Sequence, residues 1–382
     1  MQVYLDNAAA TSLDPEVLES MWPHMCNVYA NPSAVHRQGR QAKVVLERAR
    51  KTTAELLSVS PAEIYFTSGG TESNNLALQG MAAAAGVRHA ITSPLEHQAV
   101  LRPLVALQKR GALMCHWVDV DTQGSVQHDH LERLLQKLER PVLVSLMHAN
   151  NEIGNWNDLS QIGALCRSYD ALLHTDAVQT IGHCPVQFKD KMAHCASGSA
   201  HKFHGPKGVG LLYVQSGTPI AASLLGGDQE RGLRAGTESV AGAVGLSKAL
   251  EIAYRDMEKN KSHILLLKKH AVDRLRSSIP GVQFLGKSAT FAQSLHTILS
   301  IEVPFLGESA MLSFGLDIRG VSASSGSACG SGSLKTSHVL SALARPQDGR
   351  AAVRFSFSKH NTLQEVDFAV AQMATLCRAS NS

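Results

Sequence analysis

Short apolar segments alternate with longer amphipathic ones through the first half of the chain, and this alternation limits the folds open to it. The short segments, each bounded by turn residues, are 64–67, 90–93, 116–120, 142–147, 172–176 and 209–214. Helical patterns occupy 40–58, 71–85, 96–110, 128–139 and 158–169. Strands that alternate with helices of this length form right-handed crossovers. We therefore expect an α/β domain with a mainly parallel, doubly wound sheet covered by helices on both faces.

The pattern changes after the Gly-rich segment 226–236. A charged helical stretch at about 238–278 follows, and two further apolar segments, 298–303 and 352–357, flank a Ser- and Gly-rich segment at 320–333. This order predicts a second, smaller α+β domain, with the long helix as the connector. We expect residues 16–255 to form the large domain and residues 1–15 to join 256–382 in the small one.

Charge and apolar patterning exclude several classes of protein. The 36 basic and 32 acidic residues are spread along the chain, and the pair Lys268-Lys269 fits a solvated helix face better than a nucleic-acid patch. We therefore expect no direct nucleic-acid binding. No apolar run approaches the ~20 residues that span a bilayer. The start of the chain lacks a basic segment followed by an apolar one, so we expect a cytoplasmic protein without a signal peptide.

Cysteine spacing argues against a disulfide framework or a metal site. The seven cysteines include no Cys-x-x-Cys pair, and their number is odd. Small disulfide-rich domains and zinc sites normally show paired or clustered spacing. We expect no metal ion.

One match to a nucleotide-binding motif is interpreted as coincidence. Residues 281–288 fit the P-loop pattern Gly-x-x-x-x-Gly-Lys-Ser. A functional P-loop follows a strand and begins a helix that holds the phosphates. Here a helical pattern precedes the motif, its middle resembles a strand, and residues 289–294 do not resemble a helix. No G-x-G-x-x-G follows a strand, so a nicotinamide fingerprint is also absent.

Polar residues at the ends of predicted strands give a better candidate site, because ligands of open α/β sheets bind at the carboxyl ends of the strands. After 64–67, Gly69 and Gly70 lead into a helix at Thr71, where free N–H groups and a hydroxyl suit a phosphate. A flexible turn that merely begins a helix has the same pattern. The phosphate interpretation therefore needs support from elsewhere in the chain.

Two further strand ends supply that support. Asp176 ends the segment 172–176, with Gln179 three positions on; a carboxylate there can keep a heterocyclic nitrogen protonated, or it can only cap a helix. Ser199-Ala-His-Lys202 follows another predicted strand, and a lysine in such a pocket can form a Schiff base. A phosphate cup, an acid for a pyridinium nitrogen and an imine-forming lysine together predict pyridoxal 5′-phosphate as cofactor.

The chain also resembles the cysteine desulfurases, a family of the class V aminotransferase group among fold-type I pyridoxal-phosphate enzymes. The resemblance covers nearly the whole chain and implies that fold-type I architecture. It rests on these motifs, in chain order: Tyr4-Leu-Asp-Asn-Ala-Ala-Ala-Thr11, Asn31-Pro-Ser, Thr67-Ser-Gly-Gly-Thr-Glu-Ser-Asn74, Glu96-His97, Asn150-Asn-Glu-Ile-Gly154, His174-Thr-Asp-Ala-Val-Gln179, Ala200-His-Lys-Phe-His-Gly-Pro-Lys-Gly208, Arg234-Ala-Gly-Thr237, Ser324-Ser-Gly-Ser-Ala-Cys329 and Val353-Arg354-Phe-Ser.

The resemblance implies a role for each residue that would bind the cofactor ring. Lys202 would hold the cofactor through a Schiff base and later move a proton. Asp176 would pair with the pyridinium nitrogen and Gln179 with the ring hydroxyl. His97 would stack on the ring and take part in catalysis.

The resemblance likewise implies a phosphate cup. Gly70, Thr71, Ser199 and His201 would bind the phosphate within one chain. Thr237 would reach the phosphate of a neighbouring subunit, so the resemblance implies a homodimer.

Substrate binding is implied at three more residues. Asn151, which would also contact the cofactor, and Arg354 would hold the substrate carboxylate, and Asn31 would lie near it. A guanidinium suits this role because its N–H groups form a bidentate fork.

Cys329 determines which reaction we expect. It lies in Ser-Ser-Gly-Ser-Ala-Cys-Gly-Ser-Gly-Ser, which has almost no apolar side chain to pack. A buried structural cysteine is the usual alternative, and it fits Cys115 or Cys166 better. We interpret Cys329 as a nucleophile, carried on a loop of the small domain. A free thiol is only a few per cent thiolate at neutral pH, so a nearby proton acceptor or cation is expected.

The resemblance has three departures. Asn155-Trp156-Asn157 replaces an aliphatic stretch, and Gly198 stands where an aliphatic residue is common. The sequence also ends five residues after Cys377, without the longer tail that some members use to dock an iron–sulfur scaffold. We therefore expect a sulfur-acceptor protein but leave its identity open.

The sequence thus predicts a cysteine desulfurase, a transferase that converts L-cysteine to L-alanine and keeps the sulfur as a persulfide on Cys329. The sulfur would serve iron–sulfur cluster assembly, tRNA thiolation or DNA phosphorothioation. Two alternatives stay open on the same scaffold, selenocysteine lyase and cysteine sulfinate desulfinase. A non-catalytic sulfur carrier is a third, although a carrier has no use for an imine-forming lysine.

Overall fold

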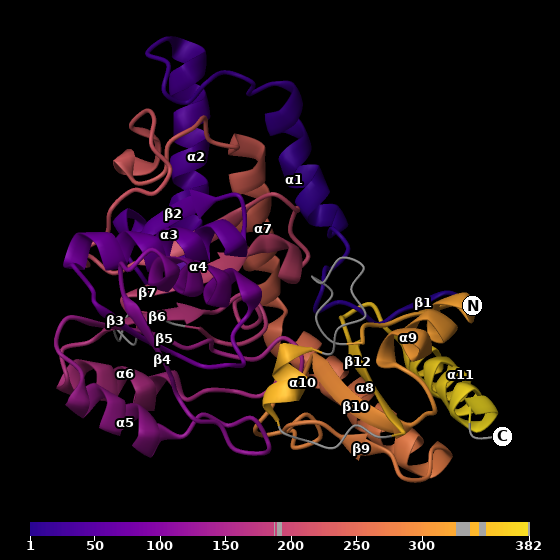
Figure 1. Ribbon diagram of the computed structural model, residues 1–382. Helices are drawn as coiled ribbons and strands as arrows, with labels where there is room; N and C mark the ends of the chain where they lie inside the picture. Colours follow the sequence, from indigo (N-terminus) through magenta and orange to yellow (C-terminus); the bar gives the residue numbers. More distant parts are fainter. Residues whose placement is uncertain (187, 189–192, 326–336, 344–348, 381–382) are drawn as a thin grey trace.

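A seven-stranded sheet forms the centre of the larger part of the molecule (Figure 1). The computed structural model describes residues 1–186, 188, 193–325, 337–343 and 349–380. The strands, in spatial order, are β2 (Ile64–Thr67), β8 (Gly210–Val214), β7 (Cys195–Ser199), β6 (Leu172–Asp176), β5 (Val142–Ser145), β3 (His89–Thr92) and β4 (Met114–Trp117). Neighbours from β4 to β7 pair in parallel, and only β8 runs antiparallel to its two partners. The predicted mainly parallel α/β sheet is confirmed.

Helices cover both faces of this sheet because its strands are apolar on both sides. One face packs on α1 (Pro15–Cys26), α2 (Arg37–Leu56) and α7 (Val240–Arg255) and, over β3, β5 and β6, on α5 (His128–Lys137) and α6 (Leu159–Ser168). The other packs on α3 (Gly70–Ala85) and α4 (Gln98–Lys109). Alternate residues of β8 show this arrangement, since Leu211 and Tyr213 face the first group of helices and Leu212 and Val214 the second. In the described part of the chain, no helix is long and apolar enough to cross a membrane.

The expected strand 116–120 is displaced in the structure. β4 begins at Met114 and ends at Trp117, because it is an edge strand that pairs only with β3 over His89–Thr92. Val120 instead forms an isolated bridge to Val126 across the turn at Gly124. Val118 is buried and Val120 is partly buried, as their apolar character indicates. The strand nevertheless ends before both of them, at Trp117.

The expected single helix over 238–278 is also wrong. It is two helices, α7 and α8 (Met257–Ser278), which share Asp256 as the C-cap of one and the N-cap of the other. Asp256 has φ −104° and ψ 11°, outside the regular helical range. α7 packs on α1 and α2, whereas α8 packs on α11 (Leu363–Ser380), so the break lets each helix meet a different layer.

The smaller part of the molecule is built on an antiparallel sheet of β9 (Gln283–Phe284), β10 (Ile298–Pro304) and β12 (Arg350–Ser356), with β10 in the middle. A second small sheet pairs β1 (Val3–Tyr4) with β11 (Val321–Ser322). The remaining elements are α9 (Ser309–Ile318), α10 (His338–Ala342) and the 3₁₀ turns Pro61–Glu63, Ala200–Lys202 and Gln229–Gly232.

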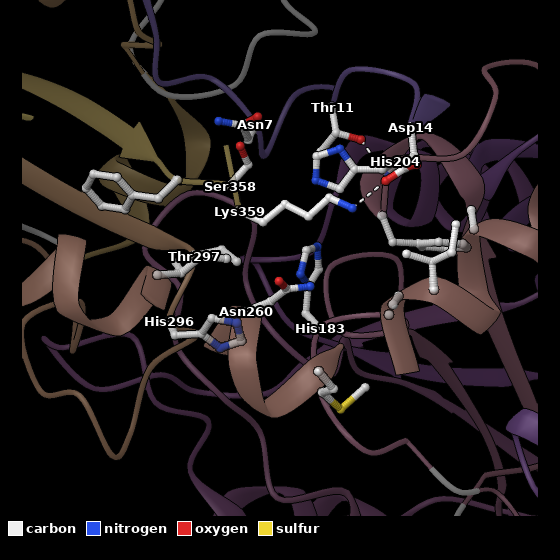
Figure 2. Close-up of a pocket in the computed structure, with 18 of the residues that line it drawn as sticks. Asn7, Thr11, Asp14, His183, His204, Asn260, His296, Thr297, Ser358 and Lys359 are labelled. Atoms are coloured by element: carbon white, nitrogen blue, oxygen red, sulfur yellow. Dashed lines mark hydrogen bonds and ion pairs between the residues drawn. The ribbon is translucent and has the colours of Figure 1, made fainter. Parts of the chain in front are cut away.

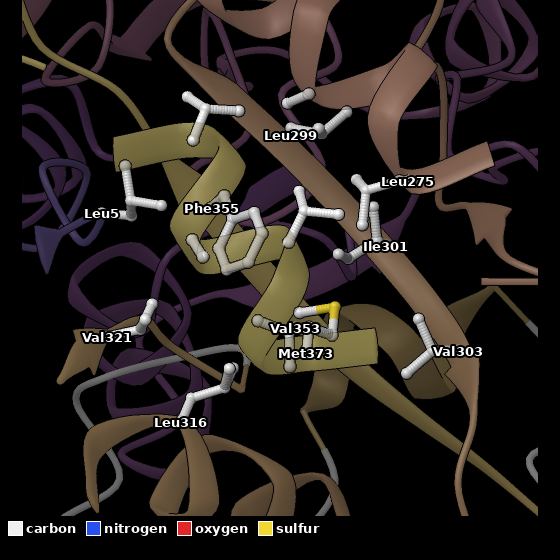
Figure 3. Close-up of a cluster of buried hydrophobic side chains, with 14 of the residues drawn as sticks. Leu5, Leu275, Leu299, Ile301, Val303, Leu316, Val321, Val353, Phe355 and Met373 are labelled. Carbon is white, nitrogen blue, oxygen red and sulfur yellow. The ribbon is translucent and has the colours of Figure 1, made fainter. Parts of the chain in front are cut away.

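One hydrophobic core fills this smaller part (Figure 3). Leu5 from the N-terminal segment, Leu275 from α8 and Met373 from α11 pack in it together with apolar residues of β10 and β12. Because the first residues of the chain contribute to this core, we propose that residues 1–15 and 256–382 form the small domain and 16–255 the large one.

Residues 281–288 do not have the structure of a P-loop. β9 lies inside the motif at Gln283–Phe284, and the residues after Ser288 form turns rather than a helix. A phosphate would therefore find no helix N-terminus here.

Lys268 lies in the core and not on a solvated face, contrary to expectation. Its side chain is fully buried, while the adjacent Lys269 is exposed. The ammonium Nζ donates to Ser294 Oγ at 2.9 Å and to the Leu295 carbonyl at 2.8 Å, which fastens α8 to the segment before β10. Burial lowers the pKa of Lys268 from 10.5 to about 7.

This shift predicts a pH-dependent stability that Lys268→Met removes. Between pH 7 and pH 10 the unfolded chain binds the Lys268 proton more tightly than the folded chain does, so burial of Lys268 opposes folding progressively less as pH rises. From pH 7 to pH 9, the free energy of unfolding of the wild type should rise relative to Lys268→Met by about 2–3 kcal/mol. Urea denaturation at both pH values measures this, with Lys269→Met as the control. A difference no larger than that of the control contradicts the assignment.

Candidate active site

A cavity of about 200 Å³, open to solvent, lies at the carboxyl ends of β2, β5, β6 and β7. Ten of the residues singled out in the sequence line it: Gly70, Thr71, His97, Asn151, Asp176, Gln179, Ser199, His201, Lys202 and Arg354. They come from segments spread over most of the chain. The sheet brings them together because parallel strands end at one edge.

One end of the cavity is the N-terminus of α3. The helix begins at Gly70 without a side-chain cap on its N–H groups. A Cβ on Gly70 would lie 2.6 Å from Val178 Cγ2, so glycine is required for this close approach. Ser199 Oγ and His201 Nδ1, which also line the cavity, are buried without a hydrogen-bond partner. A phosphate would satisfy these groups.

His201 is neutral in this arrangement. Burial, with smaller contributions from Lys202 and Lys207, lowers the pKa of His201 to about 4. A bound anion favours the charged form of a neighbouring imidazole, so phosphate binding would oppose this shift.

The carboxylate of Asp176 lies at the end of β6 and is 6% exposed. Its Oδ2 accepts a hydrogen bond from Asn74 Nδ2 at 2.7 Å, and its Oδ1 accepts one from the Val178 N–H at 3.0 Å. These bonds orient the carboxylate. The contribution of Asn74 was missed in the sequence, although its place one helical turn after Gly70 was a usable signal.

His97 and Gln179 are fixed by backbone contacts. His97 is the N-cap of α4, and its Nδ1 accepts a hydrogen bond from the Ala99 N–H at 3.1 Å. Gln179 Nε2 donates to the Ala8 carbonyl at 3.1 Å. Each side chain is therefore held by a hydrogen bond to the backbone, and both residues line the cavity.

Lys202 ends the 3₁₀ turn that follows β7. Its Nζ donates to the carbonyls of Ala8 at 2.6 Å and Ala9 at 2.9 Å, and His183 Nε2 donates to the Lys202 carbonyl at 2.8 Å. The N-terminal segment thus holds the ammonium at the cavity. The contacts of Ala8 and Ala9 were missed because backbone acceptors leave no mark on residue type.

Arg354 reaches the cavity from β12 and is 3% exposed. Its Nη1 donates to the Asn151 carbonyl at 2.7 Å, and its Nη2 pairs with Asp6 Oδ1 at 2.6 Å. Nε is buried without a partner. The guanidinium is therefore oriented by two contacts and keeps further N–H groups for an anion.

Two expected site residues, Asn31 and Thr237, are not among the described residues that line the cavity. Asn31 and Thr237 are exposed, and the Asn31 side chain accepts a hydrogen bond from the Ser33 N–H at 2.8 Å. Cys329 lies outside the described residues. The role of Thr237 was expected in a neighbouring subunit, which a single chain does not test.

A second, smaller cavity of about 30 Å³ is also lined by Ala8 and Gln179. Figure 2 shows it with His183, His204 and His296 around it. It contains His204 and His296, and burial lowers the pKa of each to about 3. Its lysine, Lys359, is paired with Asp14. Among the described residues, no group of three or more histidine, cysteine or acidic side chains is placed to hold a metal ion. The chemistry described above therefore belongs to the first cavity.

The first cavity fits pyridoxal phosphate. Unpartnered donors and a helix N-terminus suit its phosphate, the oriented carboxylate of Asp176 suits its ring nitrogen, and the amine of Lys202 suits its aldehyde.

Comparison with known proteins gives one family. The family model described as Aminotransferase class-V matches residues 3–368 of the chain. A cysteine desulfurase, IscS, from Dictyoglomus turgidum is 40% identical over 371 residues, which are 96% of this chain and 92% of that protein. A cysteine desulfurase from Sinorhizobium fredii is 41% identical over 368 residues, which are 96% and 94% of the two chains.

Solved structures agree with the sequence relatives. A NifS-like protein matches with a TM-score of 0.90 and 36% identity, covering 99% of this chain and all 100% of that one. A protein named SspA, solved in complex with cysteine, matches with a TM-score of 0.78 and 28% identity, covering 95% and 100%. The chain belongs to the aminotransferase class-V family, among its pyridoxal-phosphate-dependent cysteine desulfurases.

Proposed function

We propose that this protein is a cysteine desulfurase that converts L-cysteine to L-alanine and leaves the sulfur as a persulfide on Cys329. The observation that carries the proposal is the meeting of Lys202, Asp176, His97 and Arg354 in one cavity. The relatives named cysteine desulfurase, and a structural neighbour solved with cysteine, support it.

The cavity residues divide the work of binding. Thr71, Ser199 and His201 would hold the phosphate at the start of α3, and Asp176 would keep a proton on the ring nitrogen. Pyridoxal phosphate, when bound, supplies an aldehyde that bonds to amines and a ring that accepts electrons released at the substrate Cα. His97, which lines the same cavity, would stack on the ring and limit its motion.

Substrate handling falls to Lys202 and Arg354. The ammonium of Lys202, now on the carbonyls of Ala8 and Ala9, is the group placed to move the Cα proton. Arg354 binds the substrate carboxylate with the N–H groups that Asp6 and the Asn151 carbonyl do not use.

Cys329 completes the reaction. Its thiolate attacks the substrate sulfur, an S–S bond forms, and the Cβ–S bond breaks with its electron pair going to the three-carbon fragment. That fragment takes up protons and leaves as alanine. In the sequence, Cys329 is five residues after Ser324, whose backbone pairs with that of the cavity residue Arg354.

The destination of the sulfur is an acceptor protein, and the cytoplasmic location expected from the sequence stays a prediction. Selenocysteine lyase and cysteine sulfinate desulfinase activities are separated from the proposed one by comparing turnover of the three substrates. Only turnover of cysteine needs the Cys329 thiol absolutely.

We also propose that the protein is a homodimer with shared sites. The segment that carries Thr237 is fixed on its own chain by the buried pair Arg50–Glu230, at 2.7 Å, and by Arg234–Glu72, also at 2.7 Å. These contacts leave Thr237 itself exposed. α1 also exposes an apolar stripe of Leu18, Trp22 and Met25, which suits a protein–protein contact.

The persulfide step predicts that Cys329→Ala abolishes sulfide release. Wild-type protein incubated with cysteine and dithiothreitol should release alanine and sulfide in equal amounts, and Cys329→Ala should release neither above background. Cys26→Ala, which changes an exposed cysteine, is the matched control and should remain active. Full activity of Cys329→Ala would rule out the persulfide step.

The imine-forming lysine predicts a spectral change. The wild type should show an absorbance band near roughly 400 nm from the covalently held cofactor, and Lys202→Ala should lose this band. Lys207→Ala, which changes a nearby lysine and leaves Lys202 in place, is the matched control and should keep the band. The role of Lys202 is excluded if its variant keeps the band at full strength.

The shared site predicts weaker cofactor binding in Thr237→Ala. Loss of one hydrogen bond to a charged phosphate should weaken cofactor binding by about 1.5–3 kcal/mol, measured by equilibrium dialysis. Mixing this variant with Lys202→Ala should restore tight binding at one site of the heterodimer, since both lesions then fall in the other site. A monomer in light scattering that is fully loaded with cofactor contradicts the proposal.

A further inference from the structure

The short helix α10 joins the segments that carry His97 and Asn151. Ser337, its N-cap, accepts hydrogen bonds from the Val339 and Leu340 N–H groups. Val339, Leu340 and Leu343 pack in a small core with Leu95 and Ile153. Leu95 is two residues before His97, and Ile153 is two residues after Asn151.

His338, the first residue of α10, bonds to the chain on both sides of His97. Its Nε2 lies 2.9 Å from the Glu96 carbonyl, and its Nδ1 lies 3.1 Å from Gln98 Nε2. A carbonyl only accepts, so Nε2 of His338 carries the proton and donates. Nδ1 then accepts from the Gln98 amide, whose Oε1 accepts from Arg102 Nε at 3.3 Å.

Only a neutral imidazole in this one tautomer makes both contacts. The Nε2–H group of His338 faces the carbonyl of Glu96, and Nδ1 faces the side-chain amide of Gln98. These two residues lie on either side of His97 in the sequence. An apolar side chain at position 338 would make neither of these hydrogen bonds. The arrangement thus restrains the backbone that orients His97.

The neighbouring residue makes an equivalent contact to the second segment. Ser337 Oγ donates to Glu152 Oε2 at 2.5 Å. Glu152 is 2% exposed and follows Asn151 directly, and its N–H donates to Asn150 Oδ1 at 2.8 Å. The start of α10 is therefore fastened to both segments.

We propose that His338 is a positioning residue that fixes the ring plane of His97 over the cofactor. The proposal rests on the function proposed above, because it concerns the role of His97 in that site. His338 acts through the Glu96 carbonyl and the Gln98 side chain and does not line the cavity itself.

Three substitutions separate the two contacts. His338→Gln keeps an N–H near the position of Nε2 and so retains the bond to the Glu96 carbonyl. His338→Asn keeps an oxygen near the position of Nδ1 and so retains the acceptor for Gln98. His338→Ala removes both. The matched control is His263→Ala, which loses a histidine bond of the same 2.9 Å length to the carbonyl of Asn361.

The first measurement is the visible circular dichroism of the bound cofactor, which reports how asymmetrically its ring is held. His338→Ala should change the intensity of this band, and His338→Gln and His338→Asn should change it less. His263→Ala should leave it unchanged. The thermal midpoints of the cofactor-free variants show whether His338→Ala and His263→Ala destabilise the fold equally.

Steady-state kinetics with cysteine is the second measurement. Misplacement of a ring-contacting group should lower kcat of His338→Ala by roughly 10- to 100-fold, with KM changed much less. A His338→Ala protein with wild-type dichroism and wild-type kcat overturns the inference. A wild type that binds the cofactor but does not turn over cysteine refutes the proposed function, while the dichroism comparison still tests His338.

Discussion

The guanidinium of Arg354 is the contact on which the rest of the site depends. It joins β12, the N-terminal segment at Asp6 and the segment after β5 at Asn151, three parts of the chain that are far apart in sequence. Burial of an arginine is costly unless its charge has a partner, so Asp6 and the Asn151 carbonyl must come together with β12 for the guanidinium to be buried. The same pairing places the N-terminal carbonyls of Ala8 and Ala9 next to Lys202. A single charged side chain thus joins three segments around the cavity, and we propose that it also binds the substrate carboxylate.

The sheet provides the other half of the site. Its parallel strands end at one edge, where Asp176 and the start of α3 meet, and the Asn74–Asp176 hydrogen bond connects them directly. The polar groups left without partners, Ser199 Oγ and His201 Nδ1, lie at the same edge. Buried polar groups without partners are unfavourable in a folded chain. A ligand that carries a phosphate removes this penalty, which explains why binding of cofactor and stability of the site are expected to be linked.

Much of the fold and of the site was predictable because periodicity and strand ends are local signals. The strand 64–67 and the helix after Gly70 were found at or within one residue of their bounds. The break at Asp256 was not predicted, because the apolar periodicity continues through it. Only the packing of α7 and α8 against different layers separates the two helices. Burial of Lys268 was missed because its partners Ser294 and Leu295 are distant in sequence. The contacts of His338 to Glu96 and Gln98 likewise depend on two segments meeting in space.

We infer that one lysine, Lys202, carries the cofactor at the carboxyl edge of the sheet. Borohydride reduction of the purified holoprotein makes the bond between the cofactor and its lysine permanent, and peptide mass mapping then locates it. The account predicts a pyridoxyl group on the peptide that contains Lys202 and on no other peptide. A pyridoxyl group on Lys359, which lines the second cavity, or on a surface lysine, with Lys202 unmodified, would contradict it.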